Sequence, residues 1–141
     1  MVKGIRILLA DDDDEGVLQG VLQGLSPLLR TEEDITVVGL SLDSAAAVRL
    51  AERLSPDLAI LDVTMPLMNG IDATRRLRAL LPSTRILIVS AQPSSCYVGS
   101  ALKAGADGYV AKDAVGRELI TAIRAVLAGH GYVSEALRIS C

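Results

Sequence analysis

Short apolar runs alternate with segments of helical periodicity five times along the chain. We place strands on the apolar runs at residues 5–10, 35–40, 58–63, 85–90 and 108–112. These runs are near-continuous Val, Ile and Leu rather than alternating apolar and polar residues, which is typical of parallel strands buried on both faces. Repeated strand–helix units of this kind predict an α/β fold with a parallel sheet.

The segments between the strands carry apolar residues at the spacing of an amphipathic helix. Three such stripes are Ala45, Val48, Ala51 and Leu54; Ile71, Thr74, Leu77 and Leu81; and Val115, Leu119, Ile123 and Val126. A helix over "SSCYVGSALKAGA" is expected to end at Gly105, and Asp113 is expected to cap the last helix, which ends near Gly129. The first helix contains the repeat "GVLQGVLQGL", whose glycines each cost about 1 kcal/mol of helix propensity relative to Ala. That helix therefore either packs closely on a neighbouring backbone or is short and frayed.

The composition narrows the class of protein. At 141 residues, half of them apolar, the chain fits one globular domain. Charges interrupt the apolar runs before the roughly 18 residues of a membrane span, and no signal-peptide pattern is visible, so we expect a cytosolic protein without membrane contact. The net charge of −3 gives no electrostatic footprint for nucleic acid. The sole histidine, His130, is expected in a surface loop, which weakens any Ser-His or Cys-His mechanism.

Polar side chains stand where the predicted strands end. Asp11 and Asp12 follow the first strand, Asp62 ends the third, Ser90 the fourth and Lys112 the fifth. In an open parallel sheet, ligands bind in the crevice beyond these carboxyl ends. Carboxylates brought together there repel one another unless a divalent cation lies among them, and hard oxygen ligands suit Mg²⁺. A carboxylate nucleophile, a cation, a lysine and a hydroxyl together fit phosphoryl chemistry.

Four segments carry a family resemblance, in the right order and spacing: "LLADD", "LAILDVTMPLMNG", "ILIVSA" and "AGADGYVAKD". They resemble the signature segments of the receiver domain of two-component response regulators, and the match covers nearly the whole chain. The resemblance implies that Asp62 is the phosphoacceptor. It further implies that Asp11, Asp12 and Asp62 hold Mg²⁺ together with the backbone carbonyl of Thr64.

The same resemblance assigns the remaining groups of the site. Ser90 is implied as the switch hydroxyl, Lys112 as the phosphate-contacting lysine and Tyr109 as the switch aromatic. The implied fold is flavodoxin-like (CheY-like): a doubly wound, five-stranded parallel sheet of strand order 2-1-3-4-5 with helices on both faces. The implied partner is a sensor histidine kinase, and catalysis would be limited to self-phosphorylation and self-dephosphorylation.

The tail "GYVSEAL" is similar to the LuxR/NarL-type subfamily, whose members carry a C-terminal helix-turn-helix DNA-binding domain. We therefore expect a receiver domain at residues 1–130 and the start of a linker at residues 131–141. DNA contact and control of transcription would come from a domain outside this chain, although a stand-alone receiver is an alternative. Whether the chain forms a homodimer is left open.

Two other functions compete with this interpretation. A pseudo-receiver would keep the fold as an interaction module but usually loses the phosphoacceptor, the acidic pair or the lysine, all of which are present here. A HAD-type phosphohydrolase also uses an aspartate nucleophile and Mg²⁺, but in that family an apolar strand ends in Asp-x-Asp. Here Val63 and Thr64 follow Asp62, and neither a cap nor a later acidic pair is visible.

Overall fold

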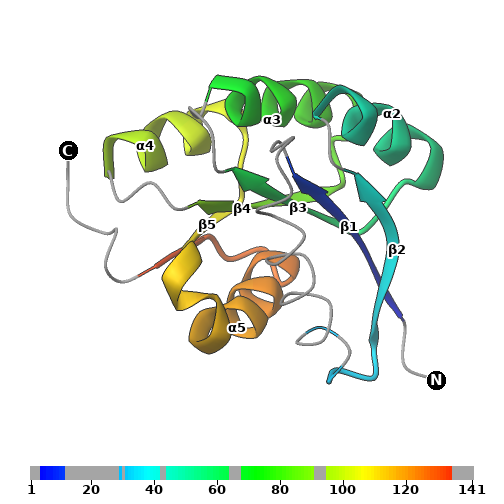
Figure 1. The fold of residues 1–141 in the computed structure, drawn as a ribbon, viewed down its shortest axis with the longest axis vertical. Coiled ribbons are helices and arrows are strands. Elements are labelled where there is room, and N and C mark those ends of the chain that lie inside the picture. The colour runs from blue at the N-terminus through cyan, green and yellow to red at the C-terminus, as the bar shows by residue number, and fades with distance from the viewer. Residues whose placement is uncertain are drawn as a thin grey trace.

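A six-stranded parallel sheet forms the centre of the fold (Figure 1). The computed structural model describes residues 4–11, 29, 31–41, 44–63, 68–90 and 95–134, with the side chains of residues 11, 44–45, 62–63, 68–70 and 95–97 outside that description. The elements in chain order are β1 (Ile5–Asp11), β2 (Ile35–Ser41), α2 (Ser44–Leu54), β3 (Leu58–Val63), α3 (Met68–Leu80), β4 (Arg85–Ser90), α4 (Ser95–Ala104), β5 (Gly108–Ala111), the 3₁₀ turn η1 (Lys112–Ala114), α5 (Val115–Leu127) and β6 (Tyr132–Val133).

The strand order is β2-β1-β3-β4-β5-β6, and each neighbouring pair is parallel. This confirms the predicted order 2-1-3-4-5 and adds a sixth strand that the sequence pattern did not predict. β6 falls in the segment expected to start a linker, and it pairs with β5. It contains only two residues, too few to produce a periodic signal.

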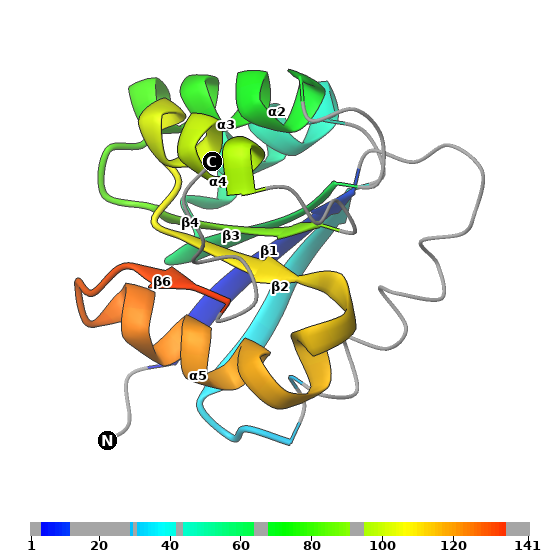
Figure 2. The same cartoon turned by 90° about the vertical axis from the view of Figure 1, so that its left-hand side faces the viewer.

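Helices cover both faces of the sheet, as predicted (Figures 1 and 2). α2, α3 and α4 lie on one face and α5 lies on the other. Successive residues of β1 point to opposite faces of the sheet. Leu8 packs in the core cluster under α2, α3 and α4, which we call the three-helix side, whereas Ile7 and Leu9 pack in the cluster of the α5 side. Both clusters are almost entirely aliphatic, since Tyr109 is the only aromatic residue among their fully buried members in the described part of the chain.

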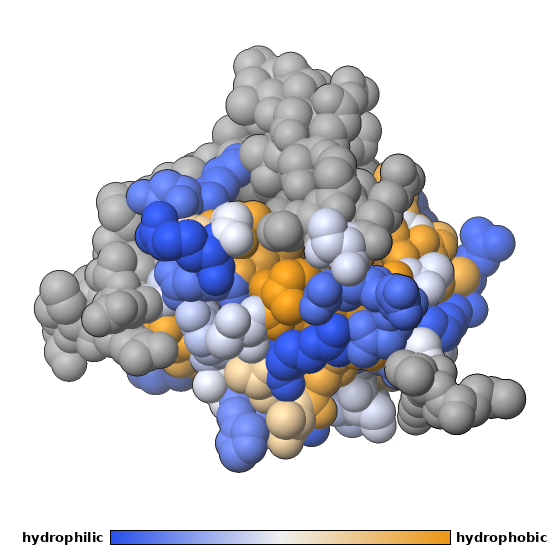
Figure 3. All heavy atoms as spheres, turned by 90° about the horizontal axis from the view of Figure 1, so that it is seen from below, coloured by the Kyte–Doolittle hydropathy of each residue, from blue (hydrophilic) through white to orange (hydrophobic). Residues whose placement is uncertain are grey.

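α5 shows how the helical pattern translates into packing. Leu119, Ala122, Ile123 and Val126 are buried against the sheet. Arg117, Thr121 and Arg124 are exposed on the opposite side of the helix. Viewed from the α5 side, hydrophilic residues alternate with several apolar areas on the described surface (Figure 3).

Two of the predictions that the structure corrects concern α5 and β2. Asp113 does not cap the last helix: it lies inside η1, and α5 begins after Ala114 without a side-chain capping hydrogen bond. The 3₁₀ turn already gives the Val115 amide a partner in the carbonyl of Lys112. β2 is not buried on both faces, because it is the edge strand of the sheet, and Leu40 is 56% exposed. The first helix, with its glycine repeat, lies outside the described residues.

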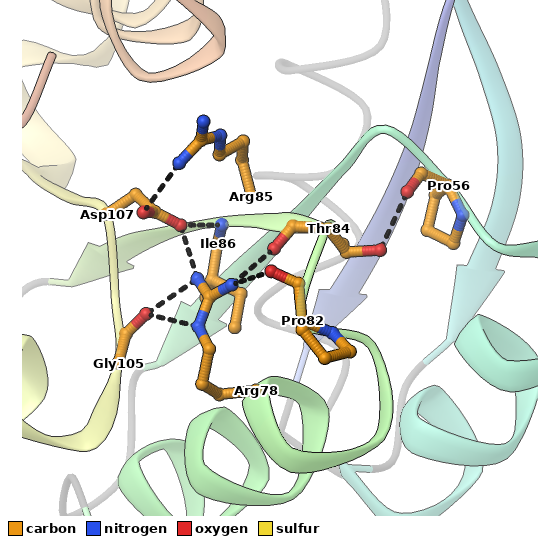
Figure 4. A network of polar contacts seen from close by, with 8 residues as sticks. All are labelled: Pro56, Arg78, Pro82, Thr84, Arg85, Ile86, Gly105 and Asp107. Atoms are coloured by element: carbon orange, nitrogen blue, oxygen red, sulfur yellow. Dashed lines mark hydrogen bonds and ion pairs between the residues drawn. The ribbon is translucent and has the colours of Figure 1, made fainter. Parts of the chain in front are cut away.

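Arg78 of α3 binds several segments at the edge of the sheet where the parallel strands begin (Figure 4). We call this the amino edge. The guanidinium of Arg78 donates two hydrogen bonds to the carbonyl of Gly105, at 3.1 and 2.8 Å, and one each to the carbonyls of Pro82 and Thr84, at 2.9 and 3.0 Å. It also forms an ion pair of 2.5 Å with Asp107. Gly105 has φ +116°, and a Cβ there would lie 2.9 Å from Arg78 Cγ, so the end of α4 requires glycine. The expected C-terminal glycine is thus confirmed, and Arg78 fixes its carbonyl.

We predict that Arg78→Lys lowers the free energy of unfolding by about 2 kcal/mol or more, because one ammonium cannot reproduce a planar fork that satisfies several carbonyls. Urea denaturation measures the change. The matched control on the same helix is Arg76→Lys, whose ion pair with Asp72 has side chains 60% and 57% exposed and should cost little. Equal losses in the two variants would contradict the role assigned to Arg78.

Candidate functional site

The register of the sheet aligns the residues that end its central strands. Asp11 of β1 is the Cα partner of Asp62 in β3. One position further along, Val63 pairs with Ser90, and Ser90 in turn pairs with Ala111 of β5. Neighbouring strands lie about 4.8 Å apart, so this register gathers four strand ends at one edge of the sheet. We call this edge, where the parallel strands end, the carboxyl edge.

Not all of the predicted site falls within the described part of the chain. The backbones of Asp11 and Asp62 are described, but their side chains are not, and Asp12 and Thr64 lie outside the described residues altogether. Among the residues whose side chains are described, no group of three His, Cys, Asp or Glu residues could hold a metal ion. The metal ligands therefore stay predictions, supported by the position of Asp11 beside Asp62 in the sheet.

Ser90 and Tyr109 are both buried. Ser90 ends β4 and is 1% exposed, and Tyr109, in β5, is 0% exposed. The tyrosine packs in the core cluster of the three-helix side, together with Ile88 and Ala101. The switch hypothesis assigns a buried ring to the phosphorylated state, so it requires a second ring position in the unmodified protein.

Lys112 lies at the carboxyl edge, although not at the end of a strand as predicted. β5 ends at Ala111, and Lys112 is the first residue of η1. It is partly exposed, and the Val115 amide donates to its carbonyl. The backbone thus passes directly from the strand into a hydrogen-bonded turn. This turn restricts the position of the Lys112 backbone from which the side chain extends.

Ser134 is a residue near the site that the sequence analysis missed. It is 0% exposed, and its Oγ accepts a hydrogen bond of 2.8 Å from the amide of Ala111, next to Lys112. Its one signal in the sequence is a small hydroxyl residue that directly follows Tyr132 and Val133 in "GYVS". His130, by contrast, is exposed after α5, as expected of a surface loop residue.

An ion-pair cluster joins α5 to the start of β2 at the opposite, amino edge. Arg124 contacts Asp34 through two hydrogen bonds, of 2.5 and 2.8 Å, and Glu32 through one of 3.1 Å. The hydrogen bond from Arg124 holds the pKa of the Asp34 carboxyl below its ordinary value. The same contacts raise the pKa of Arg124, chiefly through the bond to Asp34. This cluster lies at the far end of the sheet from Asp62, so it serves the fold rather than the site.

Comparison with known proteins identifies the family. The sequence profile of the response regulator receiver domain matches residues 7–124, which is most of the chain. The chain therefore belongs to the response regulator receiver domain family.

Individual relatives identify the type of receiver. The chain is 40% identical over 125 residues to the nitrate/nitrite response regulator NarL of Escherichia coli (strain K12), covering 89% of this chain and 56% of NarL. It is 37% identical over 126 residues to the transcriptional regulatory protein YxjL of Bacillus subtilis (strain 168), with the same coverage of 89% and 56%. A crystal structure of a LuxR-family two-component response regulator from Aurantimonas sp. SI85-9A1 superposes with a TM-score of 0.85 at 35% identity, covering 96% of this chain and 93% of that one. The protein is a receiver of the LuxR/NarL type.

The chain spans a little over half the length of these curated relatives. None of the helices in the described part of the chain is long and apolar enough to cross a membrane. The family assignment also decides against a HAD-type phosphohydrolase, whereas a pseudo-receiver would share the family and the fold.

We predict that the contribution of the Arg124–Asp34 pair to stability is lost in acid. The folded pKa of Asp34 lies below its unfolded value, so the contribution is fully present above the unfolded value and disappears as the pH falls through the folded one. Arg124→Gln should therefore lower the urea midpoint at pH 7 and lower it less at a pH well below about 4. The control Arg117→Gln, at an exposed position on the same helix, should change little at either pH. An Arg124→Gln deficit that is equally large in acid would contradict the assignment.

Proposed function

We propose that Asp62 accepts a phosphoryl group from a phosphohistidine of a partner sensor histidine kinase. A carboxylate oxygen of Asp62 attacks phosphorus in line, the phosphorus–nitrogen bond breaks, and its electron pair stays with the imidazole nitrogen as an acyl phosphate forms. The observation that carries the proposal is the register of the carboxyl edge: Asp62 lies beside Asp11, and Ser90 lies beside the residue that precedes Lys112. Family membership supports it independently.

The donor set at this edge suits Mg²⁺. The carboxylates of Asp11, Asp12 and Asp62 and the carbonyl of Thr64 would hold the ion, since it prefers hard oxygen ligands. Two of these residues, Asp11 and Asp62, are neighbours across parallel strands. When bound, the ion supplies positive charge that offsets both the crowded carboxylates and the phosphoryl oxygens.

The remaining residues act on the phosphoryl group once it is attached. Lys112 would neutralise one phosphoryl oxygen, and the hydroxyl of Ser90 would donate a hydrogen bond to another. Movement of Ser90 towards the phosphate would change the space open to Tyr109, which is fully buried in this structure. The result is a shift of an existing equilibrium at the surface formed by β4, α4 and β5.

The output of this switch is proposed to be transcriptional. The LuxR/NarL-type relatives are about twice as long as the matched segment, so a DNA-binding domain outside this chain would read the altered surface. A homodimer formed through that surface is the simplest way to present two such domains to DNA. The chain itself would catalyse only its own phosphorylation and dephosphorylation, in the cytoplasm.

We predict that incubation with a small acyl phosphate adds one phosphoryl group, seen by intact mass, only when Mg²⁺ is present. Asp62→Asn should abolish the gain because the nucleophilic oxygen is lost. The matched control Asp72→Asn changes an exposed aspartate on α3 and should leave the gain intact. If the folded wild type shows no adduct and also fails to bind beryllofluoride, the chain is a pseudo-receiver.

We predict that Lys112→Ala slows the gain of mass by about a hundredfold, the usual effect of removing one group that stabilises developing charge. Mg²⁺ affinity, measured by titration, should change little, since the lysine is not among the proposed ligands. Lys103→Ala removes an exposed lysine from the end of α4 and serves as the control. A Lys112→Ala variant that is phosphorylated at the wild-type rate would remove Lys112 from the mechanism.

A further inference from the structure

The chain after α5 returns to the sheet and closes the edge of β5. β6 runs parallel to β5, with Tyr132 opposite Gly108 and Val133 opposite Tyr109. The amide of Tyr132 donates to the carbonyl of Asp107 at 3.3 Å, and the amide of Ser134 donates to the carbonyl of Tyr109 at 2.9 Å. The segment 131–134 is therefore part of the folded domain.

Two features hold this segment in place besides the backbone ladder. The hydroxyl of Tyr132 donates a hydrogen bond of 2.6 Å to the carboxylate of Glu118 on α5. Gly108 lets the strand approach closely, since a Cβ there would lie 3.2 Å from the carbonyl oxygen of Tyr132 and still closer to two core side chains. The segment is thus hydrogen-bonded to both β5 and α5.

Ser134 extends the pairing one step beyond β6. In a continuing parallel ladder, the amide of Ala111 would bond a backbone carbonyl of the neighbouring strand. Here the side chain of Ser134 takes that place, with its Oγ 2.8 Å from the Ala111 nitrogen. Because the serine is fully buried, water does not readily replace the hydroxyl if it is removed.

The bonded amide belongs to the residue that connects the two proposed phosphate-contacting groups. Ala111 is the Cα partner of Ser90 and directly precedes Lys112. Ser134 itself is not proposed to touch the phosphoryl group, so any effect on the reaction must pass through the backbone of Ala111.

We infer that Ser134 is a positioning residue for phosphoryl transfer to Asp62, and that its bond to Ala111 couples the site to the chain beyond residue 134. The inference rests on the proposed function. Coupling of this kind is reciprocal: if the attached segment favours the phosphorylated site, then the phosphorylated site strengthens attachment of the segment by the same factor. Any further domain would then be joined to the receiver through a residue that is hydrogen-bonded to the backbone beside Lys112.

The first test compares phosphorylation rates in variants matched for the bond they lose. Ser134→Ala should slow the gain of mass from an acyl phosphate by about tenfold, because about one hydrogen bond of positioning energy is removed. The control is Thr84→Val, which removes a buried hydroxyl bonded at 2.9 Å to the carbonyl of Pro56 at the amino edge. Each variant is measured at a temperature where urea denaturation shows it to be folded. A merely structural role of Ser134 predicts similar rates in the two variants.

The second test uses the wild type, so that a variant that fails to fold does not decide the outcome. Addition of Mg²⁺ and beryllofluoride should slow hydrogen exchange at the amides of Ala111 and Ser134 several-fold, relative to the amide of Ile5, which is bonded to the carbonyl of Asp34 at the amino edge. If the wild type is phosphorylated but Ser134→Ala reacts at the wild-type rate and the exchange is unchanged, the inference is overturned and the proposed function stands. If the wild type neither gains a phosphoryl group nor binds beryllofluoride, both are overturned.

Discussion

The parallel register between β1 and β3 is the constraint on which the rest of this molecule depends. It places the backbones of Asp11 and Asp62 side by side at the end of the sheet. Long apolar runs on β1, β3 and β4 fix this register by burying both faces of the sheet under helices. Hydrophobic packing of the central strands thus positions the residues of the proposed site.

The two edges of the sheet differ in how they are held. At the amino edge, Arg78 and Arg124 each bind several acceptors from distant segments through a planar guanidinium. Such contacts are geometrically demanding and leave little freedom of movement. At the carboxyl edge, neutral groups join β5 to the following segment: the Ser134 amide donates to the Tyr109 carbonyl, and the Ser134 hydroxyl accepts from the Ala111 amide. A switch needs one end of its framework to stay fixed while the other changes, and this distribution of contacts fits that need.

The sequence predicted the framework well, for identifiable reasons. Five strands and the helices from α2 to α5 were recognised because each contributes a long apolar run or stripe, and burial on two faces leaves an unambiguous pattern. The position of Gly105 was also predictable, since a positive φ favours glycine whatever surrounds it. Asp113 was misplaced because a 3₁₀ turn, which has no periodic signal, moved the start of α5. β6 and Ser134 were missed because they depend on pairing with a strand more than twenty residues away. The metal ligands and the phosphoacceptor rest on sequence and register together, since their side chains are not described.

β6 also covers one edge of the sheet, that of β5. Were the chain cut at residue 130, the backbone groups of β5 that now pair with residues 132–134 would be left along an open edge of apolar sequence. Open edges of this kind recruit strands from other molecules and lead to aggregation. The two-residue strand covers most of that edge and, being so short, offers little edge of its own. The few residues after α5 thus protect the β5 side of the sheet from pairing with a strand of another molecule.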